Sequence, residues 1–201
     1  MFETTNLLTF LEKISDTGWT VLPISIPHAQ DLLKSAQARY ARHEFHAAAI
    51  AKNANQPEVR PSIRNDSTCW LTENSVQLTS AENMALQNLN WLKNELSRYF
   101  RIGLIDFECH YAVYSPGGSY AKHLDQKKVN NKRFFSIVIY LNENWSDKDG
   151  GQLIGYDTNE QKIFEISPRL GHAVLFRSDI EHEVLAARHP RWSLTGWFKT
   201  I

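Results

Sequence analysis

The periodicity of the chain changes near residue 104, and this change restricts the folds that the chain can adopt. Before it, apolar residues recur at helical spacing. After it come short runs rich in β-branched and aromatic residues, broken by turns such as SPGGS and SDKDGG. Many short strands after a helical block favour an antiparallel sandwich or barrel with helices packed on one face. The predicted strands are LIDFECHYAVY, RFFSIVIYLN, GQLIGY, KIFEI, GHAVLFR and RWSLTGWFKT.

The part before residue 104 predicts helices and one early strand. NLLTFLEKIS (6–15) predicts a helix that Gly18 closes, and WTVLPI (19–24) predicts a strand. A second helix is expected from Pro27 to residue 45, and a third from about Ser80 as its N-cap. Apolar stripes that are typical of packing faces run along both: Leu32, Leu33, Ala36 and Tyr40 in the second helix, and Ala85, Leu89, Leu92, Leu96 and Tyr99 in the third.

The segment between the second and third helices is polar and long. It reads AKNANQPEVRPSIRNDSTCW over residues 51–70. Structureless connections of this length are uncommon in compact domains and are usually functional when they occur. The segment therefore predicts a mobile loop with a role of its own.

Composition narrows the class of protein. With 201 residues and 42% apolar content the chain can bury a full core, and a single domain is expected. Lysines plus arginines equal aspartates plus glutamates at 22 each, which gives no global field to attract nucleic acid or an anionic membrane. The N-terminal segment predicts neither a secretory signal nor a membrane span, and Cys69 and Cys109 form no CxxC motif. We expect a soluble protein of a reducing, cytoplasmic compartment.

A histidine and an aspartate lie two positions apart in YAKHLD (120–125). On an extended segment, His123 and Asp125 would point to the same side. This indicates either an exposed strand face or two ligands of one metal ion. Two histidines and one carboxylate on one side of an ion leave three positions open, as in non-haem Fe(II) oxygenases, and His182 is a candidate third ligand. The remaining histidines considered are expected to be ordinary surface or core residues: His28, His43, His46 and His110.

Arg191 strengthens the metal interpretation. It lies nine residues beyond His182, in the last predicted strand. A guanidinium fixed on a strand that leads away from a metal could form a bidentate pair with a carboxylate. An exposed strand arginine is the alternative, and Arg188 is a rival for the same role.

Several segments together resemble a known family. YSPGGSYAKHLDQ, RFFSIVIYLNENWSDKDGGQL and FRSDIEHEVLAARHPRWSLTGWF resemble the 2-oxoglutarate/Fe(II) dioxygenases of the prolyl 4-hydroxylase type, over about residues 104–199. IRNDSTCW (63–70) is similar to the I-R-G-D…W segment of the hypoxia-inducible-factor type prolyl hydroxylases and their bacterial relatives, with Asn65 where glycine is usual. The resemblance implies an α+β fold, a double-stranded β-helix (jelly-roll, cupin-like) barrel with N-terminal helices packed on one sheet. Residues 1–201 would form one domain, with helical support and the mobile loop at about 1–103 and the barrel at about 104–199.

The resemblance also implies residue roles. His123, Asp125 and His182 would ligate iron and form the catalytic centre. Arg191 would pair with the far carboxylate of 2-oxoglutarate. The other residues implied in the cosubstrate pocket are Tyr140, Tyr114, Thr195, Val138, Leu153 and Trp197, and those implied in contact with a protein substrate are Arg64, Asp66 and Trp70.

The activity that the resemblance implies is hydroxylation of a prolyl residue in a cytoplasmic protein, with O2 and 2-oxoglutarate consumed and succinate and CO2 released. Ascorbate would support turnover, and the loop at about 47–66 would fold over the substrate. Elongation factor Tu is a candidate substrate because bacterial relatives act on it. A monomer or weak dimer without membrane or nucleic-acid partners is expected. A dioxygenase of small molecules such as a free amino acid, and a non-catalytic barrel, remain alternatives. A nucleic-acid dealkylase is disfavoured by the balanced charge.

Overall fold

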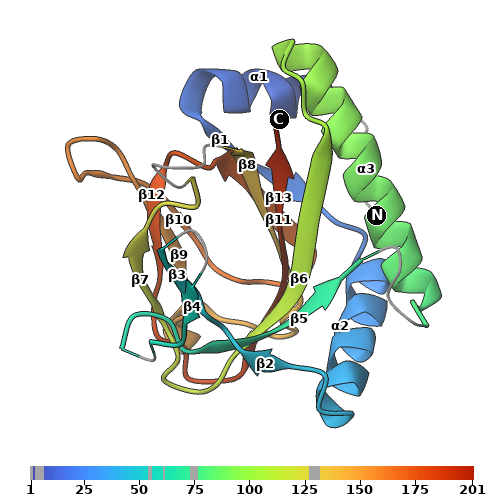
Figure 1. The fold of residues 1–201 in the computed structure, drawn as a ribbon, viewed down its shortest axis with the longest axis vertical. Helices are drawn as coiled ribbons and strands as arrows, with labels where there is room; N and C mark the ends of the chain where they lie inside the picture. Colours follow the sequence, from blue (N-terminus) through green and yellow to red (C-terminus); the bar gives the residue numbers. More distant parts are fainter. Residues whose placement is uncertain (1, 3–6, 54–55, 61, 73–76, 127–131) are drawn as a thin grey trace.

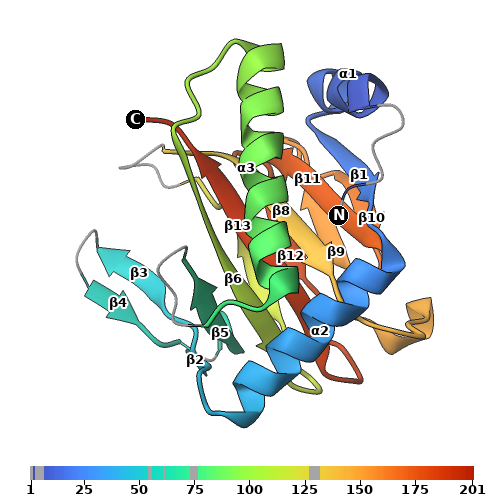
Figure 2. The same cartoon turned by 90° about the vertical axis from the view of Figure 1, so that its right-hand side faces the viewer.

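The computed structural model describes residues 2, 7–53, 56–60, 62–72, 77–126 and 132–201. Two antiparallel sheets face each other, and the helices cover the outer face of the larger one (Figures 1 and 2). The helices are α1 (Leu7–Thr17), α2 (Ile26–Ala41) and α3 (Ser80–Phe100), with a short 3-10 helix η1 (Asp147–Asp149). None of the described helices is long and apolar enough to cross a bilayer.

The larger sheet has the strand order β1-β11-β8-β13-β6-β5-β2, and the smaller has β10-β9-β12-β7. In this order the larger sheet contains β1 (Trp19–Pro23), β11 (His172–Arg177), β8 (Arg133–Tyr140), β13 (Arg191–Lys199), β6 (Asp106–Tyr114), β5 (Asp66–Leu71) and β2 (His46–Ala47). The smaller contains β10 (Lys162–Ile166), β9 (Leu153–Tyr156), β12 (Glu181–Val184) and β7 (Tyr120–His123). From β6 onward the chain passes back and forth between the two sheets, except that the consecutive strands β9 and β10 pair within the smaller one. The expected double-stranded β-helix with helices on one sheet is therefore confirmed.

The larger sheet separates two apolar cores because its strands alternate their side chains between two faces. In β6, Cys109 and Tyr111 pack against the helices, whereas Tyr114 belongs to the core between the two sheets. The inner core is completed by Val138, Tyr140, Leu153, Phe164, Val174, Phe176 and Val184. Alternate positions of β6 and β8 therefore face the interior of the barrel, where a ligand site can form: His110, Ala112 and Tyr114 in β6, and Val138 and Tyr140 in β8.

The helices differ from their predicted bounds in detail. α2 ends at Ala41 rather than at residue 45, and Tyr40 is 48% exposed instead of joining the buried stripe. Arg39 is buried in its place. The N-cap of α3 is Thr79, not Ser80, because the Thr79 hydroxyl accepts from the Glu82 amide and the Glu82 carboxylate accepts from the Thr79 amide.

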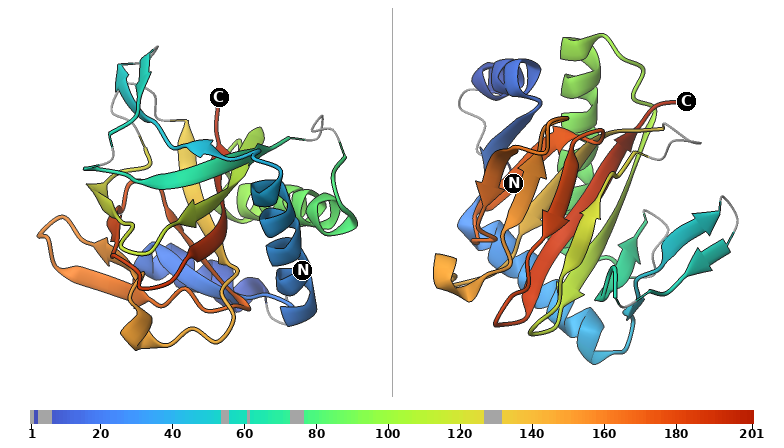
Figure 3. Two further views of the ribbon diagram at one scale, coloured as in Figure 1. Left: turned by 90° about the horizontal axis from the view of Figure 1, so that it is seen from below. Right: turned by 90° about the vertical axis from the view of Figure 1, so that its left-hand side faces the viewer.

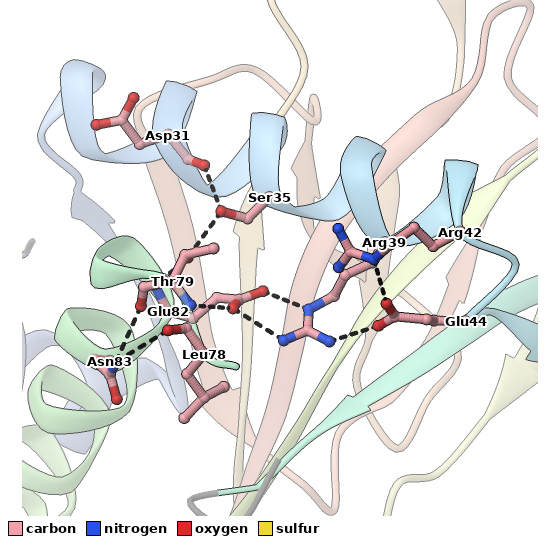
Figure 4. A network of polar contacts seen from close by, with 9 residues as sticks. All are labelled: Asp31, Ser35, Arg39, Arg42, Glu44, Leu78, Thr79, Glu82 and Asn83. Atoms are coloured by element: carbon pink, nitrogen blue, oxygen red, sulfur yellow. Dashed lines mark hydrogen bonds and ion pairs between the residues drawn. The ribbon is translucent and has the colours of Figure 1, made fainter. Parts of the chain in front are cut away.

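A buried ion-pair network joins α2 to the start of α3 (Figure 4). The Arg39 guanidinium donates to both carboxylate oxygens of Glu82, at 2.6 and 3.0 Å, and to Glu44 at 2.6 Å. Glu44 also accepts from Arg42 at 2.6 Å. Because Glu82 is fully buried and also caps α3, the network fixes how the two helices meet.

The polar segment predicted as a loop contains strands. β5 joins the larger sheet beside β6, and β3 (Ile50–Asn53) pairs with β4 (Gln56–Glu58). This β3–β4 hairpin projects from the body of the barrel (Figures 2 and 3). Residues 54, 55 and 61 of the predicted loop lie outside the described residues.

Candidate active site

The two histidines and the aspartate meet between the sheets. His123 ends β7 and lies opposite His182 of β12 in the strand register, and Asp125 follows two residues after β7. The Nε2 atom of His123 lies 3.6 Å from Asp125 Oδ1, and the Nε2 atom of His182 lies 3.5 Å from Asp125 Oδ2. The ligand atoms of all three side chains lie within 4.8 Å of one another. The predicted triad is therefore assembled in space.

Backbone carbonyls set the tautomers of both histidines. Nδ1–H of His123 donates to the carbonyl of Ala121 at 2.8 Å, and Nδ1–H of His182 donates to the carbonyl of Ile180 at 2.9 Å. The Nε2 lone pairs consequently face the common centre of the triad. The ring of Tyr120 stacks on that of His123, with centroids 3.5 Å apart, and holds its plane.

The surroundings keep the aspartate charged and the buried histidine neutral. Burial raises the pKa of Asp125, but His182 and the hydrogen bond and charge of His123 outweigh it and place this pKa well below its ordinary value. Burial lowers the pKa of His182 to about 4. Ser136 Oγ donates to Asp125 Oδ2 at 2.7 Å and lies 2.8 Å from Ser178 Oγ, which fixes the carboxylate.

This donor set fits a divalent transition metal such as Fe(II). Two neutral imidazoles and one carboxylate offer lone pairs from one side and leave the other side open. Ligand atoms each about 2.1 Å from an ion would lie roughly 3 Å apart. The observed His–Asp separations are 3.5 and 3.6 Å and all three ligand atoms lie within 4.8 Å of one another, so side-chain shifts of about 1 Å would bring them onto one ion.

A buried cation lies deeper in the barrel. Arg191, at the start of β13, is 1% exposed, and its Nε donates to the carbonyl of Gly151 at 2.8 Å. Its Nη2 has no hydrogen-bond partner among the described residues, and the same holds for the Tyr140 hydroxyl. The guanidinium lies 5.3 Å from the ring centroids of both Tyr114 and Tyr140. An acceptor-rich anion would satisfy these donors, so the arrangement fits a carboxylate.

Arg188, the rival for this role, is exposed, whereas Arg191 faces the interior. Burial raises the pKa of the Tyr140 and Tyr114 hydroxyls, so both remain neutral donors.

An inner cavity of about 40 Å³ connects the triad with Arg191. The predicted residues that line it are His123, Asp125, His182, Arg191, Tyr114, Thr195, Val138, Leu153, Trp197, Arg64 and Asp66. Tyr140 lies behind this wall against Arg191, and Trp70 lies outside it.

An outer cavity of about 890 Å³ opens on the other side of the triad. Trp70, 49% exposed, forms part of its wall together with Arg133 and residues 46–49 before the β3–β4 hairpin. Arg133 lies 3.6 Å from the ring centroid of Trp197 and pairs with Glu108 at 2.6 Å.

Arg64 and Asp66 bind each other at the boundary between the cavities. Two parallel bonds of 2.5 and 2.8 Å join them, and the guanidinium lies 4.9 Å from the ring centroid of Tyr120. Although burial lowers the pKa of Arg64, the hydrogen bonds and charge of Asp66 outweigh it, so this pKa is raised. The pair therefore braces Tyr120, which in turn holds His123.

Sequence reasoning missed some residues of the site. Tyr120, Arg133, Ser136 and Ser178 belong to it through the contacts above. His110, expected to be an ordinary strand residue, lines both cavities. The alternation of β6 contained a signal for His110, since it lies two and four positions before the inward-facing Ala112 and Tyr114. Ser136 shares its strand face with Val138 and Tyr140 in the same way.

Comparisons with known proteins agree with this geometry. Residues 109–199 match the model of the 2OG-Fe(II) oxygenase superfamily. A hypoxia-inducible factor prolyl hydroxylase of Caenorhabditis elegans is 25% identical over 94% of the chain, and the chain spans about a quarter (27%) of that relative's length.

Solved structures are similar over nearly the whole chain. A prolyl-4-hydroxylase of Pseudomonas putida is 32% identical, with a TM-score of 0.85 and coverage of 96% of this chain and 99% of the other. A prolyl hydroxylase of Trichoplax adhaerens, in complex with a hypoxia inducible factor peptide, has the same fold at 21% identity, with a TM-score of 0.78 and coverage of 94% and 87%. The chain belongs to the 2-oxoglutarate- and Fe(II)-dependent oxygenase superfamily and, within it, to the enzymes of the prolyl 4-hydroxylase type.

Proposed function

We propose that this enzyme hydroxylates a prolyl residue of a cytoplasmic protein at C4, with elongation factor Tu as the candidate substrate, and releases succinate and CO2. One observation carries the proposal. The His-Asp-His triad borders both a small inner cavity of about 40 Å³, which reaches the buried Arg191 with its Nη2 partner-free among the described residues, and an outer cavity of about 890 Å³, which offers room for a polypeptide segment.

Proximity in the structure supports the assignment of residues to iron and 2-oxoglutarate. His123, Asp125 and His182 would bind Fe(II), and Arg191 with Tyr140 would bind the distal carboxylate of 2-oxoglutarate. Bound iron and 2-oxoglutarate would supply the activation of O2 and the oxidising power for C–H hydroxylation. The charges of the ion, the triad carboxylate, the dianion and the guanidinium cancel, as a buried site requires.

The walls of the inner cavity have further roles in this proposal. Tyr114, Thr195, Val138, Leu153 and Trp197 surround the cosubstrate and exclude water from it. Exclusion of water strengthens each electrostatic contact inside the cavity.

The outer cavity would hold the target protein. Trp70 offers a half-exposed indole to a proline ring, and the β3–β4 hairpin would cover the bound segment as a lid. Arg64 and Asp66 shape the wall at which the segment meets the metal. A free amino acid would leave most of the 890 Å³ cavity unfilled, which favours a protein substrate.

Mass spectrometry tests this proposal. The purified enzyme, Fe(II), 2-oxoglutarate and ascorbate are incubated with elongation factor Tu or with free proline. We expect a mass gain of one oxygen atom on a prolyl residue of the protein, dependent on 2-oxoglutarate, and none on free proline. Turnover of free proline alone would assign the enzyme to small molecules instead.

Matched variants separate the metal site from general damage to the protein. His123→Ala should abolish the modification. His189→Ala, which changes a histidine whose side chain is 65% exposed, should leave it intact. Retention of full activity by His123→Ala would contradict the metal assignment.

A search of the host proteome extends the test beyond one candidate. Peptides from cells with and without the gene are compared for a hydroxyproline that disappears on deletion. Its appearance in another protein would keep prolyl hydroxylation and replace elongation factor Tu as the substrate.

A further inference from the structure

His110 is buried between two indoles without a hydrogen-bond partner. It is 1% exposed, and neither ring nitrogen contacts a donor or acceptor among the described residues. Trp70 and Trp197 lie against it, with ring centroids 4.8 and 5.3 Å away. A buried imidazole in this state lacks the hydrogen bonds that it makes in water, and this cost remains until a ligand or water supplies them.

Strand register places His110 beside the inner cavity. It lies opposite Thr195 of β13, and Thr195 lies opposite Val138 of β8. All three line the inner cavity, and Thr195 and Val138 do not line the outer one. His110 lines the outer cavity as well, but it shares the inner one with Thr195, Val138 and all three residues of the triad.

Within the described residues, the partner-free polar atoms in and behind the wall of this cavity divide into two groups. Arg191 Nη2, with the Tyr140 hydroxyl behind the wall, forms one group, and the His110 nitrogens and Trp197 Nε1, on residues that line the cavity together with the triad, form the other. 2-Oxoglutarate carries a carboxylate at each end of its chain. The Arg191 group suits the distal carboxylate, and a carboxylate that chelates a metal through one oxygen keeps its second oxygen free to accept a hydrogen bond.

The geometry points to His110 as the hydrogen-bond donor to the metal-end carboxylate of 2-oxoglutarate, a role that rests on the proposed function. The His110 imidazole acts as a neutral N–H donor. Burial, together with the charges of Arg64 and Arg133, lowers its pKa to about 3. A neutral donor keeps the balance of charge in the site, which an imidazolium would disturb.

Calorimetric titration with Mn(II) in place of iron tests this role without turnover. His110→Leu should weaken 2-oxoglutarate binding about 10- to 100-fold, as expected for loss of a hydrogen bond to a charged group. The affinity for Mn(II) itself should stay unchanged. His110→Gln or His110→Asn, which restores an N–H, should recover most of the loss.

Two analogues identify the end of the cosubstrate that His110 contacts. 2-Oxopentanoate keeps the metal-end carboxylate and lacks the distal one, whereas 4-oxopentanoate keeps only the distal one. His110→Leu should weaken the binding of 2-oxopentanoate by a factor similar to that for 2-oxoglutarate. It should leave the binding of 4-oxopentanoate unchanged. The matched control is His28→Leu, because His28 is also buried with an unpartnered Nε2 but lies on α2, outside both cavities. It should bind all three ligands as the wild type does.

The outcomes distinguish the inference from the proposed function. If the wild type binds Mn(II) and 2-oxoglutarate and His110→Leu binds each of them with the same affinity as the wild type, the inference is overturned and the proposed function stands. If His110→Leu loses affinity for Mn(II) and for all three organic ligands by the same factor, His110 has a structural role and the inference is also overturned. If the wild type does not bind 2-oxoglutarate in the presence of metal, the proposed function fails and the inference fails with it.

Discussion

Replacement of Arg191 by methionine should change affinity and stability in opposite directions. Arg191 is 1% exposed, and its guanidinium makes one hydrogen bond, to Gly151, while Nη2 has no partner in the described part of the chain. A buried, under-satisfied charge lowers stability, and an apolar side chain of similar length removes this cost. The same charge is needed when an anion binds.

The magnitudes follow from these contacts. Replacement of buried charged groups by well-packed apolar residues of similar volume stabilises proteins by about 1–4 kcal/mol, net of the hydrogen bonds lost. The free energy of unfolding of the ligand-free protein should therefore rise by about 1–2 kcal/mol, at the lower end of this range because the Gly151 bond is lost. For a chain of this size this corresponds to a rise of about 2–8 °C in Tm. Removal of one partner of a buried charge pair costs about 2–5 kcal/mol of binding energy, so the Kd of 2-oxoglutarate should rise roughly 30-fold or more.

Thermal unfolding without ligands and calorimetry with Mn(II) and 2-oxoglutarate measure the two effects. Arg188→Met is the matched control because Arg188 is exposed three residues away, and neither quantity should change by more than about 0.5 kcal/mol. The reasoning would be refuted if the Arg191→Met variant had a lower Tm than the wild type and bound 2-oxoglutarate with an unchanged Kd.

Other predictions concern the supports of the site. Ser136→Ala removes the bond that fixes the triad carboxylate and should weaken Mn(II) binding about 10-fold, measured by calorimetry. Glu82→Gln breaks the buried pair with Arg39 and should lower the free energy of unfolding in urea by about 3 kcal/mol. In metal-free protein, His110 and His182 have pKa values below those of the unfolded chain, so the unfolded state binds more protons. Stability should therefore fall as the pH drops from about 6.5 toward 4, by up to about 2.7 kcal/mol per pH unit for the two groups.

Each of these predictions has a control and a contradicting result. Unchanged Mn(II) affinity in Ser136→Ala would show that the carboxylate needs no such support. Glu95→Gln, which breaks an exposed pair with Arg98, should cost under about 1 kcal/mol, and an equal loss in both glutamate variants would contradict the importance of burial. His110→Leu should halve the pH slope, and an unaltered slope would exclude its contribution.

The sequence predicted the barrel and the triad but not the details that depend on tertiary contacts. The strand runs from residue 104 and the leucine stripe of α3 were readable because their periods of two and about 3.6 persist over many residues. β7 and β12 were not among the predicted strand runs because their short sequences, YAKH and EHEV, are largely polar, whereas the equally short β9 is marked by its apolar sequence LIGY. Tyr40 was wrongly placed in the core because Arg39, satisfied by Glu82 and Glu44, is buried in its place.

The site shows the same limit. His123, Asp125, His182 and Arg191 could be found because their spacing and chemistry match one family pattern. The membership of His110 depends on the register between β5, β6 and β13, which places it between two tryptophans. The alternation of β6 places His110 on the inward face with Ala112 and Tyr114, but no spacing along the chain reveals its neighbours on the adjacent strands, and single histidines in strands are usually ordinary residues.

Crystals grown with Fe(II) and 2-oxoglutarate without oxygen give the most direct test of the central claim. Anomalous scattering at the iron edge should place one ion between the Nε2 atoms of His123 and His182 and the carboxylate of Asp125. The distal carboxylate of 2-oxoglutarate should lie against Arg191. An iron peak elsewhere, or 2-oxoglutarate bound away from this arginine, would contradict the account.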